Sequence, residues 1–349
     1  MKITEMTDGT NVYGNFFVND VKRCVDNKGG NYLAVVLQDS SGTMEGRKWS
    51  STLEDEDIIV KGKVIYIEGK VNKYNKTLQL KIMEAAKVNE DEVDWAQFIS
   101  TAPMDLKVMK AKLDAYVDSI QNNDVKMLVT KLLANFAKRF YVWPAAVRNH
   151  HDYISGLLYH SITMADMAVK VCSVYPQINR DVLLGGAIIH DLGKTVELSG
   201  VQSTAFTLEG KMLGHISIGQ AELRKAAKEL GMYAYDDLPE EEQVETHPLF
   251  RKKEVAVCME HMILSHHGQP DFGSPVRPLT REAHVLAAID DLDAKMNILD
   301  KAYASVEPGN STAKLFNMDE RYFYKPFYTV EPDRPAGLNV EQAFEELKK

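Results

Sequence analysis

A histidine and an aspartate stand side by side at the end of an apolar segment, in the sequence AIIHDLGK. They are His190 and Asp191, followed by Gly193 and Lys194. Neighbouring residues of a helix point about 100° apart, so the two side chains meet at one point only where the helix ends. A neutral imidazole beside a carboxylate suits a Mn, Fe or Zn ion. The pair alone is more typical of a capping aspartate beside a buried histidine, because the dipeptide is common.

More histidines and aspartates lie on apolar segments with helical spacing. His160 occurs in GLLYHSITMADMA, and Asp290 begins the acidic part of VLAAIDDLDAKMN. A buried carboxylate is unfavourable unless it is paired or binds a metal. His215 begins HISIGQAEL, and the pair His266 and His267 ends ILSHHG. One such residue is typical of a core, but His or Asp on four or five consecutive helices indicates a common metal centre.

Two kinds of element surround these residues. From residue 105 to about residue 304, apolar residues recur three and four positions apart, which predicts helices. Residues 11–88 instead form short β-rich runs, one of them over 58–71, separated by turn sequences at 27–30, 39–42 and 73–76. Several strands without intervening helices are typical of a small barrel or sandwich. We therefore expect a β domain over 1–90, an acidic linker over 91–104, an all-α domain over 105–314, and a tail over 315–349 that packs on the helices.

Composition places limits on the class of protein. The 349 residues favour two domains, and 45% hydrophobic with 26% charged residues is ordinary for a globular chain. Three scattered cysteines without a CxxC pair predict no disulfide framework or zinc knuckle, and they fit a reducing cytoplasm. The N-terminus has no apolar signal-peptide core, and no run of about 18 apolar residues predicts a membrane span.

The net charge of −9 argues against a nucleic-acid partner, but residues 58–88 are an exception. They contain seven lysines and two glutamates. The alternative interpretation is a solvated face that protects an edge strand from pairing.

The order His160, His190–Asp191, Asp290 resembles the H…HD…D pattern of HD-domain phosphohydrolases. His215, His266 and His267 are similar to the additional histidines of the bimetallic members, among them the cyclic-di-nucleotide phosphodiesterases. Two features of those phosphodiesterases are absent. The position of their glutamate, four residues before the first histidine, is Gly156 here, and their tyrosine-proline signature does not follow the histidine pair.

A narrower resemblance covers nearly the whole chain. The stretches NHHDYISGLLYHS, HHGQPDFGSPVRPLTREAHVLAAIDDLDAKMN and ERYFYKPF resemble the YhaM-type 3′→5′ exoribonucleases of low-GC Gram-positive bacteria. That family joins an N-terminal OB-fold to an HD domain, and the β-rich LAVVLQDSSGTMEGRKW followed by LQLKI fits this layout. The resemblance implies a small all-β OB-fold barrel, an all-α HD domain, and a 3′→5′ exonuclease that hydrolyses single-stranded RNA to nucleoside monophosphates. Single-stranded DNA remains an alternative substrate.

The resemblance also implies the residues of the site. Asp291 stays an alternative to Asp290, and a solvated lysine stays an alternative to a phosphate contact for Lys194. The catalytic residues implied are Asp191 and Lys194, and the metal ligands are His160, His190, Asp191, His215, His266, His267 and Asp290. Metal ions suit phosphodiester cleavage because they neutralise the charge that repels hydroxide and lower the pKa of water. Two divalent ions are implied, with Mn²⁺ favoured and Fe²⁺ or Mg²⁺ open.

OB domains bind single strands through a basic groove and aromatic faces on which bases stack. The predicted nucleic-acid contacts are Trp49, Lys61, Lys63, Lys73, Tyr74, Lys76, His150 and His151. A structural role fits the two histidines equally well. Phe17, Tyr32 and Tyr66 face either the nucleic acid or the barrel core, because the register of the strands is open.

Two other functions are considered. The first is hydrolysis of small or cyclic nucleotides by the same HD site, without need of the β domain. The second is a non-catalytic nucleic-acid-binding protein, which requires an incomplete ligand set, whereas every expected ligand occurs in this chain. The aromatic tail at 322–324 is either a subunit contact in a homo-oligomer or packs on its own helical domain.

Overall fold

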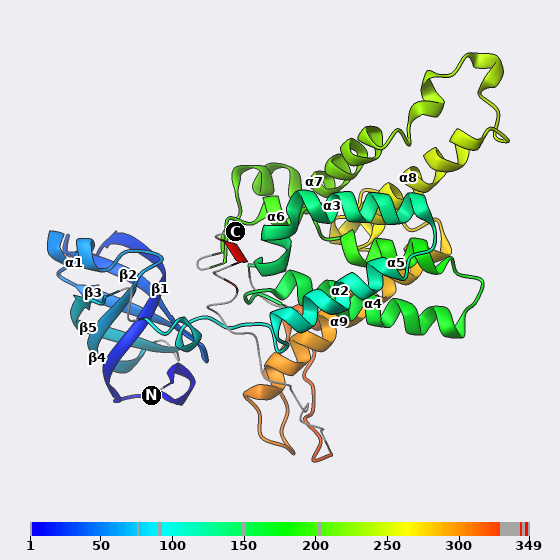
Figure 1. Cartoon of the computed structure of the whole chain (residues 1–349). Coiled ribbons are helices and arrows are strands. Elements are labelled where there is room, and N and C mark those ends of the chain that lie inside the picture. Colours follow the sequence, from blue (N-terminus) through cyan, green and yellow to red (C-terminus); the bar gives the residue numbers. More distant parts are fainter. Residues whose placement is uncertain are drawn as a thin grey trace. The chain divides into compact units, whose positions relative to one another are not determined.

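The computed structural model describes residues 2–74, 77–89, 93–147, 151–201, 204–328, 343 and 346–347. The chain divides into two compact units, Met1–Thr101 with Gly200–Thr204, and Ala102–Ser199 with Ala205–Lys349. Figure 1 shows the β strands in the first unit and the long helices in the second. The division falls inside the segment that the sequence marks as a linker.

The first unit is a closed five-stranded barrel of OB type. Its strands are β1 (Asn11–Val25), β2 (Asn31–Asp39), β3 (Gly42–Trp49), β4 (Val64–Tyr74) and β5 (Thr77–Lys87). Around the barrel the order is β1-β2-β3-β5-β4, with β3 and β5 parallel and every other pair antiparallel. Inward residues alternate along β2, where Leu33, Val35 and Leu37 are buried in the core.

A helix between β3 and β4 corrects the expected all-strand pattern. The sequence predicts a strand from residue 58, but α1 (Leu53–Ile58) ends there and β4 begins only at Val64. The helix starts with a capping box, in which the Thr52 hydroxyl accepts from the Asp55 amide and the Asp55 carboxylate accepts from the Thr52 amide. The capping box therefore favours a helix up to Ile58, although the β-branched run Ile58–Val60 predicts a strand.

The C-terminal part of the barrel unit lies in the expected linker. The short 3₁₀-helix η3 (Trp95–Gln97) is held by the Ser40 amide, which donates to the carbonyl of Gln97. Phe98 and Ile99 are buried, and the ring of Trp95 contacts that of Phe17 edge-on. The described residues 95–99 thus pack on the barrel instead of forming an extended connection.

The second unit consists of helices arranged around α5. Its helices are α2 (Leu106–Asp118), α3 (Asn123–Val142), α4 (Gly156–Val174), α5 (Arg180–Ile189), α6 (Lys194–Glu197), α7 (Leu208–Glu229), α8 (Pro248–Ser265) and α9 (Arg281–Ala304). α5 contacts α3, α4, α8 and α9, and every residue from Leu183 to Ile189 is buried. A β-carbon at Gly186 would lie 2.2 Å from the terminal methyl of Met262, so α8 packs closely against α5 at this glycine.

The tail is described only in part. After η7 (Phe316–Met318), the Lys325 ammonium donates to the Tyr303 carbonyl, and the Tyr303 hydroxyl donates to the Tyr324 carbonyl. Beyond residue 328, most of the expected tail lies outside the described residues. Within the described part of the chain, no helix is both long and apolar enough to cross a membrane.

Candidate active site

The structure brings the seven predicted metal ligands together from five places in the helical unit. α4 supplies His160, the end of α5 supplies His190 and Asp191, and α9 supplies Asp290. His215 follows Gly214, whose positive φ of 71° kinks α7, and His266 and His267 follow the end of α8. Most of these side chains therefore project from helix ends or a kink, where adjacent residues can point to the same place.

The first group of ligand atoms surrounds one oxygen of Asp191. His160 Nε2 lies 3.1 Å from His190 Nε2 and 3.2 Å from Asp290 Oδ1. Asp191 Oδ2 lies 3.4 Å from His190 Nε2. Asp291, the alternative to Asp290, is exposed and pairs with Lys295. The geometry therefore favours Asp290 as the residue of α9 that faces this group.

The second group surrounds the other oxygen of the same carboxylate. Asp191 Oδ1 lies 3.4 Å from His215 Nε2 and 3.5 Å from His266 Nε2. A ring nitrogen of His267 lies within 4.8 Å of those of His215 and His266. Asp191 is thus placed between two sets of ligands and faces each with a different oxygen.

These separations fit metal coordination better than hydrogen bonding. Nitrogen and oxygen ligands bind Zn²⁺ at about 2.0–2.2 Å, so two ligands of one such ion lie about 3.0–3.6 Å apart. Three buried atoms of the second group, Asp191 Oδ1, His215 Nε2 and His266 Nε2, have no hydrogen-bond partner among the described residues. Because buried polar atoms are normally satisfied, these three atoms point to a bound cation.

The histidine rings are oriented by bonds to their other nitrogen. A donor bond from Nδ1 fixes the tautomer that leaves Nε2 free to bind a metal. Each Nδ1 lies close to an acceptor: Ala187 O at 3.0 Å for His190, Ile263 O at 2.7 Å for His266, Phe272 O at 2.7 Å for His267, Glu197 Oε1 at 3.1 Å for His215, and Asp293 Oδ2 at 2.7 Å for His160. All five rings are therefore turned with Nε2 towards the cluster.

Burial and neighbouring charge set the protonation of the site. Burial alone would raise the pKa of Asp191, but Lys194 and His190 outweigh it and hold that pKa well below its usual range. Burial lowers the pKa of His266, and burial with the adjacent His266 lowers that of His267 to about 4. Burial also disfavours charge on His160, yet Asp290 and Asp293 raise its pKa to about 10. Asp191 is thus ionised, and the neutral forms of His266 and His267 are favoured.

Lys194 lies at the cluster instead of in solvent. Its ammonium is 2.6 Å from Asp191 Oδ2, and the side chain is only 9% exposed. Burial alone would lower its pKa, but Asp191 outweighs burial and raises it, so the lysine keeps its charge. A buried cation beside the ligand carboxylate is placed to meet an anionic substrate.

The position of the absent glutamate is closed to any side chain. A β-carbon on Gly156 would lie 2.0 Å from the carbonyl oxygen of His151. The backbone of the preceding loop therefore passes directly over the start of α4. The departure from the cyclic-di-nucleotide phosphodiesterase pattern is thus built into the backbone.

His151 does not take the place expected for a nucleic-acid contact. Its side chain is 2% exposed, and its two ring nitrogens lie 2.6 Å from the Tyr153 hydroxyl and 2.7 Å from Asp293 Oδ2. The loop carries it inwards, so it supports the cluster from behind. His150 and Lys76 lie outside the described residues.

The barrel presents aromatic and basic side chains on the outer face of β2 and β3. Trp49 is 44% exposed and stacks on Tyr32 with ring centroids 4.6 Å apart. Arg47 lies over the Tyr32 ring, and its β5 partner Lys81 is exposed. Rings with adjacent cations on a β face suit stacked bases. This stripe is the candidate nucleic-acid surface.

The other predicted contacts are distributed differently. Phe17 is fully buried against Trp95 and is not part of the barrel's core cluster, whereas Tyr74 is 65% exposed at the tip of the β4–β5 hairpin. Lys61, Lys63 and Lys73 are exposed, and Lys61 lies 3.9 Å from Asp20. In the parallel β3–β5 pair, Glu45 lies beside Gln79. Trp49 lies four residues after Glu45, whereas the hairpin tip at Thr77 lies two residues before Gln79, so six residues separate them along the strands. At about 3.3 Å per residue, this separation is about 20 Å.

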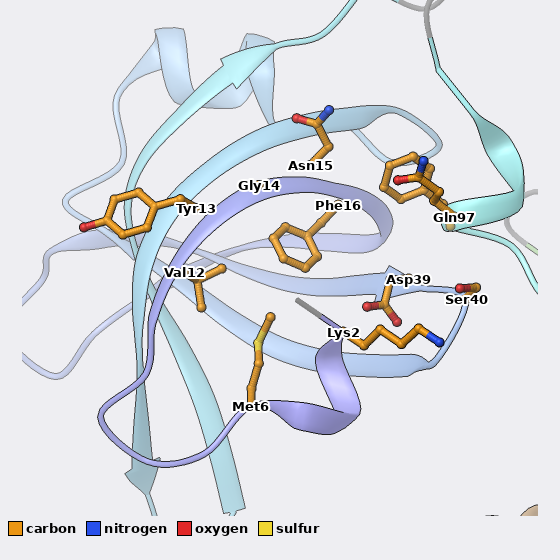
Figure 2. A pocket seen from close by; sticks show the side chains of 11 residues that line it. Lys2, Met6, Val12, Tyr13, Gly14, Asn15, Phe16, Asp39, Ser40 and Gln97 are labelled. Atoms are coloured by element: carbon orange, nitrogen blue, oxygen red, sulfur yellow. The ribbon is translucent and has the colours of Figure 1, made fainter.

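A pocket of about 480 Å³ occurs at the end of the barrel where β2 finishes (Figure 2). Figure 2 shows Phe16 and Met6 on its apolar side and Lys2, Asn15 and Gln97 around it. Asp39, the last residue of β2, lines it, whereas Tyr32 is near the start of the same strand. The pocket and the Tyr32–Trp49 stripe are therefore separate surfaces.

Comparisons with known proteins agree with both units. A model of the HD domain matches residues 157–295, and a model of the OB-fold nucleic acid binding domain matches residues 17–88. A third model, described as a putative helicase, matches residues 112–178. The 3′-5′ exoribonuclease YhaM of Geobacillus sp. (strain WCH70) is 37% identical over 326 residues, which cover 93% of this chain and 94% of that protein. The chain belongs to the YhaM family of 3′-5′ exoribonucleases.

Among solved structures, the second OB-fold domain of replication protein A from Methanococcus maripaludis resembles part of this YhaM-family chain. It is 20% identical and covers 26% of this chain and 95% of its own, with a TM-score of 0.22. A likeness of this size carries no argument about function.

Two residues of this YhaM-family site did not stand out in the sequence, whereas Asp293 was a candidate for a supporting or surface role. Asn297 follows Asp290 at a helical spacing of seven, so it shares its face of α9, and that spacing could have identified it. Glu197 accepts from both the backbone and the ring of His215. No sequence signal marks it, because it ends a four-residue helix and meets its partner only after a kink.

Proposed function

We propose that this chain is a metal-dependent exonuclease that removes nucleoside monophosphates from the 3′ end of single-stranded RNA. The observation that carries the proposal is the convergence of five histidines and Asp290 on Asp191, with three buried ligand atoms left unpartnered among the described residues. Membership of the YhaM family supplies the direction and the RNA substrate.

In this proposal, each residue of the cluster has a defined part. His160, His190, Asp191 and Asp290 hold one divalent ion, and His215, His266, His267 and Asp191 hold another. Bound ions neutralise the phosphodiester charge and make a water molecule acidic enough to attack near neutral pH. The bonds from Nδ1 keep the five rings oriented before substrate arrives, so the site needs little reorganisation during the reaction.

Lys194 is proposed as the contact to a non-bridging phosphate oxygen. Its ammonium lies at Asp191 Oδ2 and stays charged although it is buried. A charge-assisted bond to phosphate is stronger than a neutral one, particularly where water is excluded. Lys194 would thus help to place the scissile phosphate beside the cluster.

The barrel is proposed to hold the single strand. Trp49, stacked on Tyr32, and the cations Arg47 and Lys81 form a face on which bases and phosphates can bind without sequence preference. Since stacking does not read the 2′-hydroxyl, single-stranded DNA is expected to compete for this face. The hydroxyl itself distinguishes RNA from DNA at a given site.

The finer properties are proposals as well. Two Mn²⁺ ions are favoured for a site of histidine and carboxylate ligands, with Fe²⁺ and Mg²⁺ as the competitors. We place the enzyme in the cytoplasm, because its three cysteines are free. The exposed aromatic residues Phe316, Tyr322, Phe327 and Tyr328 are proposed as a self-association surface, which size-exclusion chromatography of Phe327→Ser would test.

A time course on single-stranded RNA tests the main proposal. RNA labelled at either its 5′ or its 3′ end is incubated with the full chain and Mn²⁺. Release of the 3′ label as mononucleotide, with stepwise shortening of the 5′-labelled strand, is expected. Asp191→Asn should lower the rate by at least about 100-fold because both ligand groups lose their shared carboxylate.

Asp291→Asn is the matched control, because this nearby aspartate of α9 is exposed and pairs only with Lys295 in the described chain. Its rate should equal that of the wild type. Absence of RNA shortening together with turnover of small or cyclic nucleotides would keep the hydrolytic site and reject the exonuclease.

A further inference from the structure

Asp293 is a buried carboxylate whose one oxygen meets two histidines. Its Oδ2 lies 2.7 Å from Nδ1 of His160 and 2.7 Å from Nε2 of His151. The side chain of Asp293 is 13% exposed, and those of His160 and His151 are 1% and 2% exposed. Asp293 follows Asp290 by three residues on α9, so the two carboxylates approach His160 from the same helix, one at each ring nitrogen.

These contacts are hydrogen bonds and not metal coordination. A separation of 2.7 Å is normal for a charge-assisted N–H···O bond, but it is shorter than the about 3.0–3.6 Å between two ligands of one ion. An ionised carboxylate only accepts hydrogen bonds, so both histidines donate to Asp293 from these nitrogens. The ring of His160 is thereby turned with Nε2 towards the cluster.

His151 is itself held from three sides. Its amide donates to Asn297 Oδ1 at 2.9 Å, and its Nδ1 accepts from the Tyr153 hydroxyl at 2.6 Å. Its backbone φ of 47° is in the left-handed region, as is the φ of 61° at Ser155. Non-glycine residues are rare there, and such strain persists only where the surroundings determine it. The loop therefore holds an unfavourable conformation that keeps His151 on Asp293.

We propose that Asp293, with His151 behind it, is the positioning residue for His160, fixing its tautomer and ring angle as a metal ligand. The proposal rests on the proposed metal-dependent function and adds to it a defined role for two residues that touch neither the metal nor the RNA. Outer partners of this kind typically change metal affinity by about 10- to 100-fold when they are removed.

The first test measures metal binding by the full chain without RNA. Metal-free Asp293→Asn is titrated with Mn²⁺ by calorimetry and by electron paramagnetic resonance. We expect an affinity about 10- to 100-fold weaker than that of the wild type. Asp291→Asn, on the exposed side of the same helix turn, should bind as the wild type does. Equal affinities for Asp293→Asn and the wild type would overturn the proposal.

The second test reads the proton on Nδ1 of His160 directly and needs neither metal nor substrate. In the chain labelled with ¹⁵N-histidine, long-range ¹H–¹⁵N spectra should show a proton on Nδ1 of His160. The signal should be lost or shifted in Asp293→Asn and unchanged in Asp291→Asn. An unchanged signal in Asp293→Asn would reject the positioning role. If the wild type binds no Mn²⁺ while this signal depends on Asp293, the metal proposal fails and the positioning role stands.

A third variant, His151→Phe, tests the role of the loop separately from that of the Asp293 carboxylate. It also keeps the proposal testable if Asp293→Asn does not fold. The phenylalanine fills a similar volume but removes the bond from Nε2. We expect a smaller loss of Mn²⁺ affinity than for Asp293→Asn, because His160 keeps its own bond. In single-turnover RNA cleavage, both variants should lower the rate constant while the affinity for RNA stays unchanged. A change confined to RNA affinity would contradict a role at His160.

Discussion

Asp191 is the residue on which the whole site depends. One of its oxygens faces His190, and the other faces His215 and His266. A conservative change is therefore felt by both ligand groups at once. Most of the other predicted ligands, in contrast, belong to only one of the two groups. At this scale, residue type and order identify histidines and aspartates that the structure brings together, but they do not reveal which residues stand behind them. Glu197 and His215 meet only after the chain has turned at Gly214.

The protonation of His160 gives a prediction for pH. Burial opposes its charge, but Asp290 and Asp293 raise its pKa from 6.5 to about 10, so the metal-free chain holds a proton that an ion must displace. Mn²⁺ binding should thus release a proton, and affinity should rise with pH up to about 10. Calorimetry in buffers of different ionisation enthalpy measures the release. A binding enthalpy independent of the buffer would contradict it.

The same raised pKa has a consequence for stability. Stabilisation by charged His160 is fully present below pH 6.5 and is lost as pH rises through about 10, so the metal-free chain should melt at lower temperature in that window. His160→Gln serves as the control, because it lacks this titration. Its melting temperature should vary less with pH over the same range.

At the scale of elements, helical periodicity identified the helices that carry the ligands. Other elements depend on local caps and on contacts between residues far apart in the sequence. The short helix α1 was missed because the β-branched residues 58–60 were read as a strand, although the sequence TLED carries its capping box. The packing of residues 95–99 on the barrel was not predictable, because the partner Phe17 is 78 positions away from Trp95. Phe17 lies between the core residues Phe16 and Val18, so its burial depends on the same distant contact with Trp95.

The contact between α6 and α7 depends on a glycine. A β-carbon on Gly193 would lie 2.0 Å from the carbonyl of His215, whereas one on Gly219 would have ordinary contacts at 3.5 Å or more. Gly193→Ala should therefore destabilise the fold by about 1–3 kcal/mol, since the backbone must move. Gly219→Ala should be within about 1 kcal/mol of the wild type, because alanine favours a helix.

Urea unfolding of the two variants measures the difference. Because Gly193 separates Asp191 from the start of α6, the Gly193 variant should also bind Mn²⁺ more weakly. Equal free energies of unfolding for the two variants would contradict this prediction, because they would show that the backbone at Gly193 can move at little cost.

On the scale of the whole molecule, the proposed function assigns RNA binding to the barrel unit and hydrolysis to the helical unit. Trp49→Ala should weaken binding of single-stranded RNA by about 5- to 100-fold, since stacking contributes about 1–3 kcal/mol per base. Its turnover of a small substrate such as bis(p-nitrophenyl) phosphate should be unchanged, because that substrate needs only the helical unit. Fluorescence anisotropy and a colorimetric assay measure the two quantities.

Tyr13→Ala is the matched control for this experiment. Tyr13 is 64% exposed and lines the pocket at the other end of the barrel. RNA affinity should be near that of the wild type if the strand follows the Tyr32–Trp49 stripe. The opposite ranking of the two variants would move the nucleic-acid surface to the pocket.

The ligands are spread along the chain from His160 to Asp290, and the residue that positions the first of them is Asp293. During synthesis the barrel, within the first 101 residues, leaves the ribosome long before the last helix does. With RNA binding by the barrel as proposed, we expect a nascent chain to bind RNA before it can hydrolyse it. A chain that ends before α9 lacks Asp290 and Asp293, so we expect such a product to bind RNA without hydrolysing it.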